Sequence, residues 1–479
     1  MARREKFCER ISRRASPASD ADETVEWKPI MIQKLLQTST VSIDTRTIER
    51  GQIFFAIKGD RVDGHDFLDD AIKKGACALV INVSAKDRLP KLCFDQNNVS
   101  IICVPDTVRA LVETAREWRG RFDCPIVGIT GSIGKTTTKE MVHSILRQTD
   151  LSHHVSYKNQ NSLIGLCLNI VNMRLGCQVA VFELGISLRD EMEKKASILR
   201  PTIGIITTVA HSHMAGLGGL EEIACEKRKI FTFFGSTDTG IICGDQKLLS
   251  DVSYAHPVIS FGLKKKDNNV RASSIRTYSE EESFGVCFSL HISSEEVLVR
   301  LQTNHRGQVH NALAASSVAS LLGIDLQKIV DGLQEYAGCE GRFESRKLRK
   351  NRGWLINDCY NANPESMRAA LLAFHELPAE KKIAVLGDML ELGEREVFLH
   401  QQVGQVLSQT TSISQVILVG DRARHIAQTA PKLLDIVYVN DWKQATTMLE
   451  KMLVEHPVRV LVKASHAIGL GNLVRQVCE

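Results

Sequence analysis

A buried strand followed by a glycine-rich turn and a helix is the feature that most constrains this chain. The stretch "CPIVGITGSIGKTTTKEM" has an apolar run, then Gly131 and Gly134, then residues with helical spacing. The N-terminal amides of a helix and a glycine-rich turn together present N–H donors to phosphate oxygens. The common phosphate-loop pattern has a glycine five positions before the Gly-Lys pair, whereas Ile129 stands there in this chain. We nevertheless predict a nucleotide-binding loop, because the strand, the turn and the Gly-Lys-Thr triplet are all present.

The residues of this loop have distinct expected roles. Lys135 is placed to reach the β- and γ-phosphates, and the Thr136 hydroxyl is placed to hold Mg²⁺. The strand context and the triplet argue against the alternative, a glycine-rich turn that binds nothing. We therefore predict that the nucleotide is held by Gly131, Ser132, Ile133, Gly134, Lys135, Thr136 and Thr137.

The theme of a short apolar strand, a turn and a helical stretch recurs along the chain. A chain of 479 residues is too long for one hydrophobic core. β-branched runs that alternate with helical patterns predict parallel sheets covered on both faces. Residues 284–303 show strict alternation instead, which predicts an antiparallel annex. We predict an α/β protein with a disordered basic tail over residues 1–26. Three domains are expected to follow, an N-terminal one over residues 27–105, a central one over 106–338 and a C-terminal one over 339–479.

The C-terminal part contains five strand candidates of its own. Several of them end in Asp or Asn, and open α/β sheets bind ligands at the carboxyl ends of their strands. This part is therefore predicted to form a second ligand-binding sheet. The candidates are "GWLIND", "KKIAVLGD", "SQVILVGD", "DIVYVN" and "VRVLVKAS".

Charge and cysteine content narrow the class of protein. The first fourteen residues have six basic and two acidic side chains, an excess of four that equals the net charge of the whole chain, so the rest is formally neutral. A neutral body argues against nucleic acid as a partner. Thirteen cysteines without any C-x-x-C pair indicate reduced, packed thiols of a cytoplasmic protein, not a disulfide framework or zinc cluster. No run of 18 apolar residues exists, so no membrane insertion is expected.

Two side chains follow strands that we expect to flank the glycine loop. Glu183 ends "VAVFEL" and His213 follows "IGIITTV". A carboxylate and an imidazole beside a triphosphate are natural ligands for a divalent ion. His211, two residues earlier, is an open alternative to His213. Lys227, within "EEIACEKRKIF", belongs by residue type alone to a solvated helical face.

In its motifs and in their order, the chain resembles the Mur ligases. The shared stretches are "GITGSIGKTTTKEM", "ELG", "RPTIGIITTVAHSH", "EKRKIF", "NALAA", "GRFE", "INDCYNANPESMRAAL" and "VLGDMLELGE". The family's loop has a glycine at the position of Gly131, which makes this a phosphate loop of variant spacing. "SIDTR…GQIFFAIKGDRVDGHDF" resembles the family's UDP-binding domain. The resemblance covers nearly everything after residue 30 and implies a UDP-binding domain, an ATP-binding domain and a Rossmann-like C-terminal domain.

The resemblance also implies an activity, ATP-dependent formation of an amide bond. A substrate carboxylate would attack the γ-phosphate to give an acyl phosphate and ADP, and an amine would then displace phosphate. "YNANPESM" with "LGDMLELGE" resembles the family member that adds D-alanyl-D-alanine. The implied substrates are a UDP-N-acetylmuramoyl-tripeptide (UDP-MurNAc-tripeptide) and D-alanyl-D-alanine (D-Ala-D-Ala), in cytoplasmic peptidoglycan precursor synthesis. The expected oligomeric state is a monomer.

Site residues carry over from the family position by position. Lys227 matches a lysine that is carbamylated in the family, and adjacent Arg228 and Lys229 would favour the anionic carbamate unless they face solvent. Two Mg²⁺ ions are implied, with Thr136, Glu183, His213 and Lys227 as their ligands, while Lys135, Lys227 and His213 are the implied catalytic residues. ATP contacts carry over to Asn311, Arg342 and Asp358. Substrate contacts carry over to Thr45, Arg46, Asn159, Asn161, Ser162, Asn361, Asn363 and Ser465.

Two stretches depart from the family pattern, and other functions stay open. "HRGQ", residues 305–308, stands where the family has a G-x-H-N run, and Ala464 and His466 replace a glycine and an arginine in "KASHAIG". One alternative is a sister ligase that adds another amino acid, although the D-N-P-R motif of the diamino-acid-adding relative is absent. A stand-alone P-loop NTPase is a second, and an inactive scaffold, which the intact loop argues against, is a third.

Overall fold

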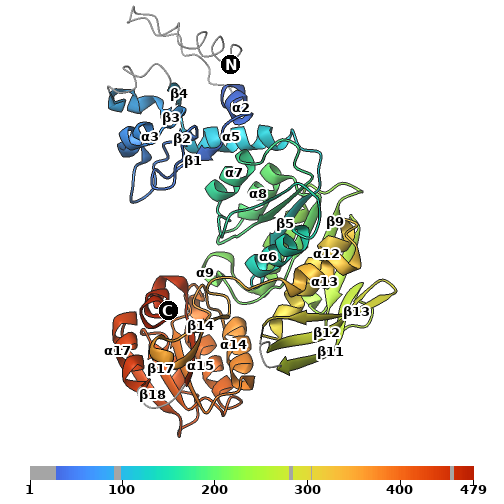
Figure 1. Cartoon of the computed structure of the whole chain (residues 1–479), viewed down its shortest axis with the longest axis vertical. Helices are drawn as coiled ribbons and strands as arrows, with labels where there is room; N and C mark the ends of the chain where they lie inside the picture. The colour runs from blue at the N-terminus through green and yellow to red at the C-terminus, as the bar shows by residue number, and fades with distance from the viewer. Residues whose placement is uncertain (1–28, 91–98, 280–283, 304, 454–457, 479) are drawn as a thin grey trace, which may run out of the picture. The chain divides into compact units, whose positions relative to one another are not determined.

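We describe the fold from a computed structural model of the chain. It describes residues 29–90, 99–279, 284–303, 305–453 and 458–478. The predicted tail, residues 1–26, lies outside this range. Within the described residues, three sheets of four, nine and six strands form the framework, and most of their pairs are parallel (Figure 1). The α/β class predicted from the sequence is therefore confirmed.

Contacts within the chain divide it into two compact units. The first unit comprises residues 1–124, 156–179 and 197–199, and the second comprises residues 125–155, 180–196 and 200–479. We describe each unit by itself. The predicted domain boundaries near residues 105 and 338 stay a prediction.

The first unit contains the four-stranded sheet, whose strands are all parallel in the order β1-β2-β3-β4. Alternate residues of its strands, including Phe54 and Leu79, pack against the apolar side of α3. The strands predicted from "GQIFFAIKG" and "ACALVI" are confirmed. The elements of this unit are α2 (Ile30–Leu36), β1 (Val41–Ser42), β2 (Ile53–Phe55), η1 (Gly64–Phe67), α3 (Leu68–Lys73), β3 (Ala78–Asn82), η2 (Val83–Arg88), β4 (Ser100–Val104), α5 (Thr107–Arg119) and α7 (Leu163–Val171).

The nine-stranded sheet of the second unit has the order β13-β12-β11-β10-β9-β8-β5-β7-β6. β5 pairs in parallel with both β7 and β8, so the loops that follow these three strands lie at one edge of the sheet. The parallel strands are β5 (Ile126–Thr130), β7 (Val179–Glu183), β8 (Ile203–Ile206), β9 (Thr239–Cys243) and β10 (Val258–Gly262), and β6 (His153–Val155) lies at the edge.

The far end of this sheet is antiparallel, as predicted. β12 pairs antiparallel with β11 and with β13, and α12 and α13 lie beside these strands (Figure 1). The annex begins earlier than predicted, because β11 belongs to it. These strands are β11 (Val270–Ser279), β12 (Phe284–Ile292) and β13 (Glu295–Leu301).

Small residues let the helices of this sheet approach one another closely. A Cβ on Gly332 of α13 would lie 2.4 Å from the Cα of Ile145 in α6. α12 also packs on α6, and its buried residues include Ala315 and Ser316. The helices are α6 (Lys135–Leu146), α8 (Glu191–Leu199), α9 (Met214–Leu217), α10 (Leu220–Arg228), η3 (Lys229–Phe231), α11 (Lys247–Ser250), α12 (Gly307–Leu321) and α13 (Leu326–Gln334).

The C-terminal sheet has the order β14-β15-β19-β16-β17-β18, and only β14 is antiparallel to its neighbour. All five predicted strands are confirmed. β14 escaped prediction because its sequence, "ESRK", is polar throughout. The strands are β14 (Glu344–Lys347), β15 (Gly353–Asn357), β16 (Lys381–Gly387), β17 (Gln415–Val419), β18 (Asp435–Val439) and β19 (Val458–Lys463).

Helices cover both faces of this C-terminal sheet. Successive strand residues point to opposite faces, so Ala384 and Leu386 join one apolar core while Ile383 and Val385 join another. The first core includes residues of α14, α15 and α16, and the second includes residues of α17 and α18. The helices are η4 (Arg349–Asn351), α14 (Pro364–Glu376), η5 (Gly393–Arg395), α15 (Glu396–Leu407), α16 (Arg424–Ala427), α17 (Trp442–Met452), η6 (His466–Ile468) and α18 (Leu470–Val477).

The cysteines and the helices bear on the class of protein predicted from the sequence. The eleven cysteines within the described ranges are all free thiols, and all but Cys225 are at least partly buried. None of the helices described has both the length and the apolar character of a membrane-spanning segment.

Candidate functional site: a nucleotide loop and a shared pocket

The loop between β5 and α6 requires glycine at two positions. Gly131 has φ +149° and Gly134 has φ +89°, values that L-residues with a side chain rarely adopt. A Cβ on Gly131 would lie 1.9 Å from the Thr207 hydroxyl, and one on Gly134 would lie 2.2 Å from the Asn311 amide oxygen. Ile129, by contrast, belongs to β5 and is fully buried. The glycine is needed at 131 because the chain passes closely by Thr207 there.

The segment after β8 holds this loop in shape. The hydroxyls of Thr207 and Thr208 donate to the Ile133 carbonyl at 2.6 and 3.2 Å. The Ser132 backbone N–H donates to the Thr208 carbonyl at 2.7 Å, and its hydroxyl donates to the Ala210 carbonyl at 3.0 Å. These bonds fix the loop's backbone before any ligand binds.

Lys135, at the start of α6, points back over the loop. Its ammonium group donates to the Gly131 carbonyl at 2.7 Å. Burial is the main cause that lowers the pKa of Lys135 to about 8, while Glu183 acts in the opposite direction and the cations Arg342 and Lys195 lower it further. A buried ammonium group whose pKa is lowered in this way is typical of a site that binds an anion.

The next residue, Thr136, contacts the predicted metal ligand Glu183. Its hydroxyl donates to the Glu183 carboxylate at 2.9 Å, and Glu183 is buried at 2% exposure. Parallel pairing of Ile129 with Glu183 brings the end of β7 beside the end of β5. The expectation that Glu183 lies beside the loop is therefore correct.

His213 and its alternative His211 each contact a glutamate from an element that follows a strand of the C-terminal sheet. Nδ1 of His213 contacts the Glu391 carboxylate, and Nδ1 of His211 contacts the Glu365 carboxylate. Burial lowers the pKa of His213, and Lys135 and Lys227 lower it further while Glu391 opposes them. The pKa of His213 thus depends on the charges of Lys135 in the loop and of Lys227.

α10 exposes Glu221 and Glu222 but buries two other charged residues, so the reading of "EEIACEKRKIF" as a solvated face is wrong at two positions. Lys227 and Glu226 are 1% and 4% exposed. The Glu226 carboxylate accepts the Met192 backbone N–H at 3.1 Å and pairs with Lys229 at 2.8 Å. Lys229 also pairs with Asp190 at 2.5 Å, so its charge is already matched.

Lys227 itself has no acidic partner within the ranges that the structure describes. Among the described residues, no hydrogen bond or ion pair reaches its ammonium group. Burial holds the pKa of Lys227 well below its ordinary value, Lys135 and Lys195 lower it further, and Glu226 opposes them. The cations that act on it are thus Lys135 and Lys195, whereas the guanidinium of Arg228 donates to a backbone carbonyl at 2.7 Å.

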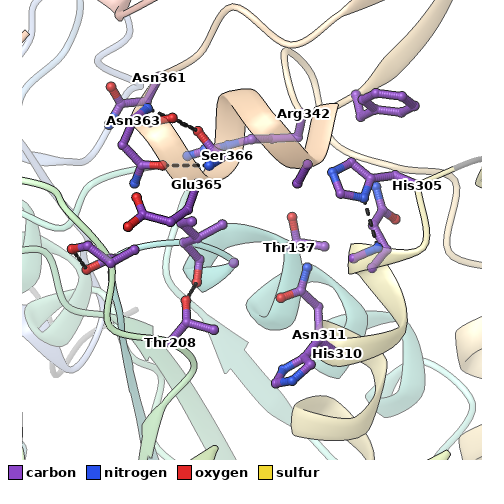
Figure 2. A pocket seen from close by; sticks show the side chains of 18 of the residues that line it. Thr137, Thr208, His305, His310, Asn311, Arg342, Asn361, Asn363, Glu365 and Ser366 are labelled. Carbon is purple, nitrogen blue, oxygen red and sulfur yellow. Dashed lines mark hydrogen bonds between the residues drawn. The ribbon is translucent and has the colours of Figure 1, made fainter. Parts of the chain in front are cut away.

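A pocket of about 300 Å³ lies between the glycine loop and the C-terminal sheet (Figure 2). Figure 2 shows Thr137 and Asn311, from α6 and α12, on one side of this space and side chains at the start of α14 on the other. Its lining includes seven of the ten residues predicted to hold ATP, and Gly131, Lys135 and Thr136 are not part of it. The seven are Ser132, Ile133, Gly134, Thr137, Asn311, Arg342 and Asp358, together with the predicted substrate residues Asn361 and Asn363.

Arg342 and Asp358 are fixed by the residues around them. The Arg342 guanidinium stacks 3.8 Å above the Tyr360 ring, and its buried Nε has no hydrogen-bond partner in the described part of the chain. Asp358 accepts the Phe343 backbone N–H at 3.1 Å and pairs with Lys463 at 2.7 Å. An orphaned guanidinium nitrogen is costly in isolation, which favours an anion as its partner in this pocket.

The predicted dipeptide residues differ in their surroundings. The Asn363 side chain caps α14 by accepting the Ser366 N–H at 2.8 Å, so one of its polar atoms has a structural role. Asn361 lines the pocket, and its backbone carbonyl accepts from Lys463 at 3.0 Å. The buried Ser465 hydroxyl accepts the Leu390 N–H at 2.9 Å and is not part of the lining.

The remaining predicted substrate residues all belong to the first unit. Arg46 is exposed and its guanidinium pairs with Asp44 at 2.6 Å, while Thr45 is buried. Ser162 caps α7 by accepting the Gly165 N–H at 3.2 Å. Asn159 is exposed and Asn161 half-buried, next to that cap. These side chains remain predictions as substrate contacts.

Several residues of the pocket were not predicted from the sequence. His305 packs its ring against Phe343 at 4.8 Å, and His310 lies 3.8 Å from Asp245. Isolated histidines and glutamines have no spacing that marks them as ligands, whereas Lys463 and Glu365 had a signal in their position at the end of a strand and the start of a helix. The unpredicted lining residues are Thr208, Val209, Ala210, Gln246, His305, Gly307, Gln308, His310, Phe343, Ala362, Glu365, Ser366, Ala369 and Lys463.

Together, the fold and the pocket define an ATP-binding α/β protein in which a P-loop domain and a second parallel sheet share one site. The chain matches three family profiles, described as "Mur ligase family, catalytic domain" over residues 37–119, "Mur ligase middle domain" over 129–319 and "Mur ligase, glutamate ligase domain" over 341–466. A UDP-N-acetylmuramoyl-tripeptide–D-alanyl-D-alanine ligase from Buchnera aphidicola is 31% identical over 444 residues, 92% of each chain. The chain belongs to the Mur ligase family.

Solved structures agree with this assignment. MurF from Acinetobacter baumannii is 26% identical with a TM-score of 0.78, over 94% of this chain and 98% of that one. MurF ligase from Thermotoga maritima, in complex with ADP, is 26% identical with a TM-score of 0.75, over 92% and 97%.

Proposed function

We propose that this protein is the ligase that joins D-Ala-D-Ala to a UDP-MurNAc-tripeptide, with hydrolysis of ATP to ADP and phosphate. The observation that carries the proposal is the pocket in which the glycine loop and Asn311 face Arg342 and Asp358. A stand-alone NTPase needs no second sheet at its nucleotide, whereas a ligase must bring an amine to the activated carboxylate there. Relatives that carry this activity in their names match over nearly the full chain and support the proposal.

The chemistry needs ATP because a carboxylate is a poor electrophile. An oxygen of the tripeptide's terminal carboxylate attacks the γ-phosphorus, and ADP leaves. The free amine of D-Ala-D-Ala then attacks the acyl carbon, phosphate leaves, and the nitrogen loses a proton. Lys135 and Arg342 supply positive charge where the phosphoryl group moves, so the protein acts mainly by positioning and by charge neutralisation.

Mg²⁺ fits the residues beside the loop. The Thr136 hydroxyl and Glu183 carboxylate supply the oxygen ligands that this ion prefers, and Nε2 of His213 has no partner among the described residues. Bound there, Mg²⁺ would neutralise phosphate charge. We propose Thr136, Glu183, His213 and a carbamate on Lys227 as the ligands of two ions.

Carbamylation suits the surroundings of Lys227. A neutral amine can attack the carbon of CO₂, forming a nitrogen–carbon bond and releasing one proton to leave an anion. Burial and the nearby cations Lys135 and Lys195 lower the pKa of Lys227 and so favour the neutral amine, and the same cations stabilise the anion once it forms. An unpaired ammonium in this position would have no such compensation.

The proposal is tested by phosphate release from ATP with UDP-MurNAc-tripeptide present, with and without D-Ala-D-Ala. We expect release to require both substrates and a product with the mass of the UDP-pentapeptide. Release that ignores both substrates would contradict the proposal in favour of an NTPase. Release with a different amino component would retain the ligase chemistry and assign the protein to a sister activity. The expected enzyme is a cytoplasmic monomer.

A further inference from the structure

The imidazole of His213 is held from the C-terminal sheet. Its Nδ1 contacts the carboxylate of Glu391, which lies in the loop after β16, and the Ser187 hydroxyl is 3.5 Å from the same nitrogen. Both members of the pair have left-handed backbone conformations, with φ +55° at His213 and +64° at Glu391. Residues with side chains adopt this region at a cost and cluster at functional sites.

The contact around this pair is built from more than one interaction. Met214, the residue after His213, packs against the apolar core that contains Met389 and Leu392. The Ala215 backbone N–H donates to the Glu391 carbonyl at 3.2 Å. The segment that carries His213 is therefore seated on the loop that carries Glu391.

We propose that Glu391 is a positioning residue for the metal ligand His213, an inference that rests on the proposed function. Its carboxylate accepts the Nδ1–H, which fixes the tautomer and ring orientation and leaves Nε2 as the nitrogen that binds metal. A ligating histidine almost always donates its other N–H to such an acceptor, and removing that acceptor weakens metal binding. Glu391 is 57% exposed, so solvent screens its charge and orientation is its main contribution.

The positioning residue comes from a different sheet than the other predicted ligands. Glu183 ends β7 of the nine-stranded sheet and Thr136 lies in α6, which follows β5 of that sheet, whereas Glu391 follows a strand of the C-terminal sheet. Metal affinity therefore depends on the contact between His213 and the loop after β16, which carries Glu391. By linkage, bound metal favours that seating to the same extent.

The test is Mn²⁺ binding, measured by electron paramagnetic resonance of free Mn²⁺ titrated with full-length protein, a non-hydrolysable ATP analogue and bicarbonate. Glu391→Ala is expected to weaken Mn²⁺ binding about tenfold. Glu391→Gln is expected to restore most of the affinity, because its amide oxygen accepts the same N–H. His213→Ala reports the loss of the ligand itself.

A matched control separates orientation from contact between the sheets in general. Glu376 of α14 pairs with Arg306, the residue before α12, at 3.3 Å, and in the described part of the chain no hydrogen bond or ion pair joins either residue to a predicted metal ligand. Glu376→Ala is expected to retain the wild-type Mn²⁺ affinity. Equal weakening in Glu376→Ala and Glu391→Ala would overturn the proposal, as would wild-type affinity in Glu391→Ala.

The outcome is distinguishable from failure of the proposed function. An active ligase whose Glu391 variants bind Mn²⁺ like the wild type overturns the positioning role alone. A protein without ligase activity that shows the graded series retains the positioning role. Wild-type protein that binds no Mn²⁺, or His213→Ala with unchanged affinity, overturns the positioning role together with the proposed metal site.

Discussion

Among single residues, Lys227 illustrates how burial converts an ordinary side chain into a reactive one. Its neighbours in the sequence are charged, yet it is enclosed and has no acidic partner among the described residues. A surface lysine is protonated and inert toward CO₂, whereas a buried one is held neutral by the cost of desolvating its charge. The same physics that makes Lys227 destabilising as a cation makes it available as a nucleophile.

We predict that Lys227→Ala lowers ligation by about 10²-fold or more, because an anion beside the phosphates is lost. Short carboxylates such as acetate should restore part of the activity by occupying the vacated volume. The measurement is phosphate release with both substrates, and Lys247→Ala, at an exposed lysine, serves as the control. Undiminished activity of Lys227→Ala in bicarbonate-free buffer would contradict the carbamate.

His310 gives a prediction about stability and pH. Burial opposes its charge, but the nearby Asp245 carboxylate, together with Cys243, prevails and raises the pKa of His310 to about 9. Between the unfolded value near 6.5 and about 9, the folded state binds more protons than the unfolded state. The contribution of His310 is therefore complete below pH 6.5 and is lost as pH rises through 9, by at most about 1.4 kcal/mol per pH unit.

The measurement is the melting temperature of nucleotide-free wild type and His310→Gln from pH 6 to 9.5. The variant should be less stable than wild type at the acid end, and the two curves should converge at the alkaline end. Curves that stay parallel across this range would show that the Asp245–His310 pair is not protonated as the structure indicates.

Residues with a motif around them could be predicted from the sequence, and isolated ones could not. Lys135, Thr136 and Glu183 were assigned to one site because a strand and a glycine loop fix where they lie. Glu391 carried no such signal, because its role depends on a histidine 178 positions earlier that only the fold brings within reach. The role of a residue can thus be predicted from sequence where local structure fixes its geometry. It cannot be predicted where only tertiary contacts fix that geometry.

At the scale of elements, the glycine loop gives the sharpest prediction. Gly134→Ala forces both a strained backbone, costing about 1–2 kcal/mol, and a clash with the Asn311 amide. Gly323→Ala, in the turn between α12 and α13, carries the same strain at φ +70° with open space around the new methyl. We expect both variants to have lower melting temperatures, Gly134→Ala more so because of the clash, but a loss of ADP binding of more than about tenfold only for Gly134→Ala.

Calorimetric titration with ADP decides between local strain and site geometry. Equal ADP affinities in the two variants would mean that the loop moves aside without cost, and that Gly134 is not needed for the nucleotide.

Elements were predictable where apolar runs identify them. β16, β17 and β19 are rich in apolar residues and buried on both faces, so their continuous apolar runs were enough to locate them. β14 is an edge strand with alternating half-buried and exposed positions filled by polar side chains, and its sequence reads as a loop. Asn363 caps α14 and also lines the pocket, so its predicted substrate contact stays a prediction.

At the scale of the whole molecule, the two substrates are predicted to bind to different units. The residues expected to contact the sugar nucleotide belong to the first unit, and the ATP pocket belongs to the second. Phosphoryl transfer nevertheless requires the tripeptide carboxylate to reach the γ-phosphate. We therefore predict that the chain becomes more compact when it binds a non-hydrolysable ATP analogue and UDP-MurNAc-tripeptide together.

Solution scattering measures this directly through the radius of gyration. The radius should decrease with both ligands and less with either alone, because only the ternary complex bridges the two units. Gly134→Ala, which is expected to bind nucleotide poorly, should not compact under the same conditions. An unchanged radius in wild type with both ligands bound would mean that the catalytic arrangement forms without domain motion, and that the carboxylate reaches the phosphate by movement of the substrate's own flexible peptide.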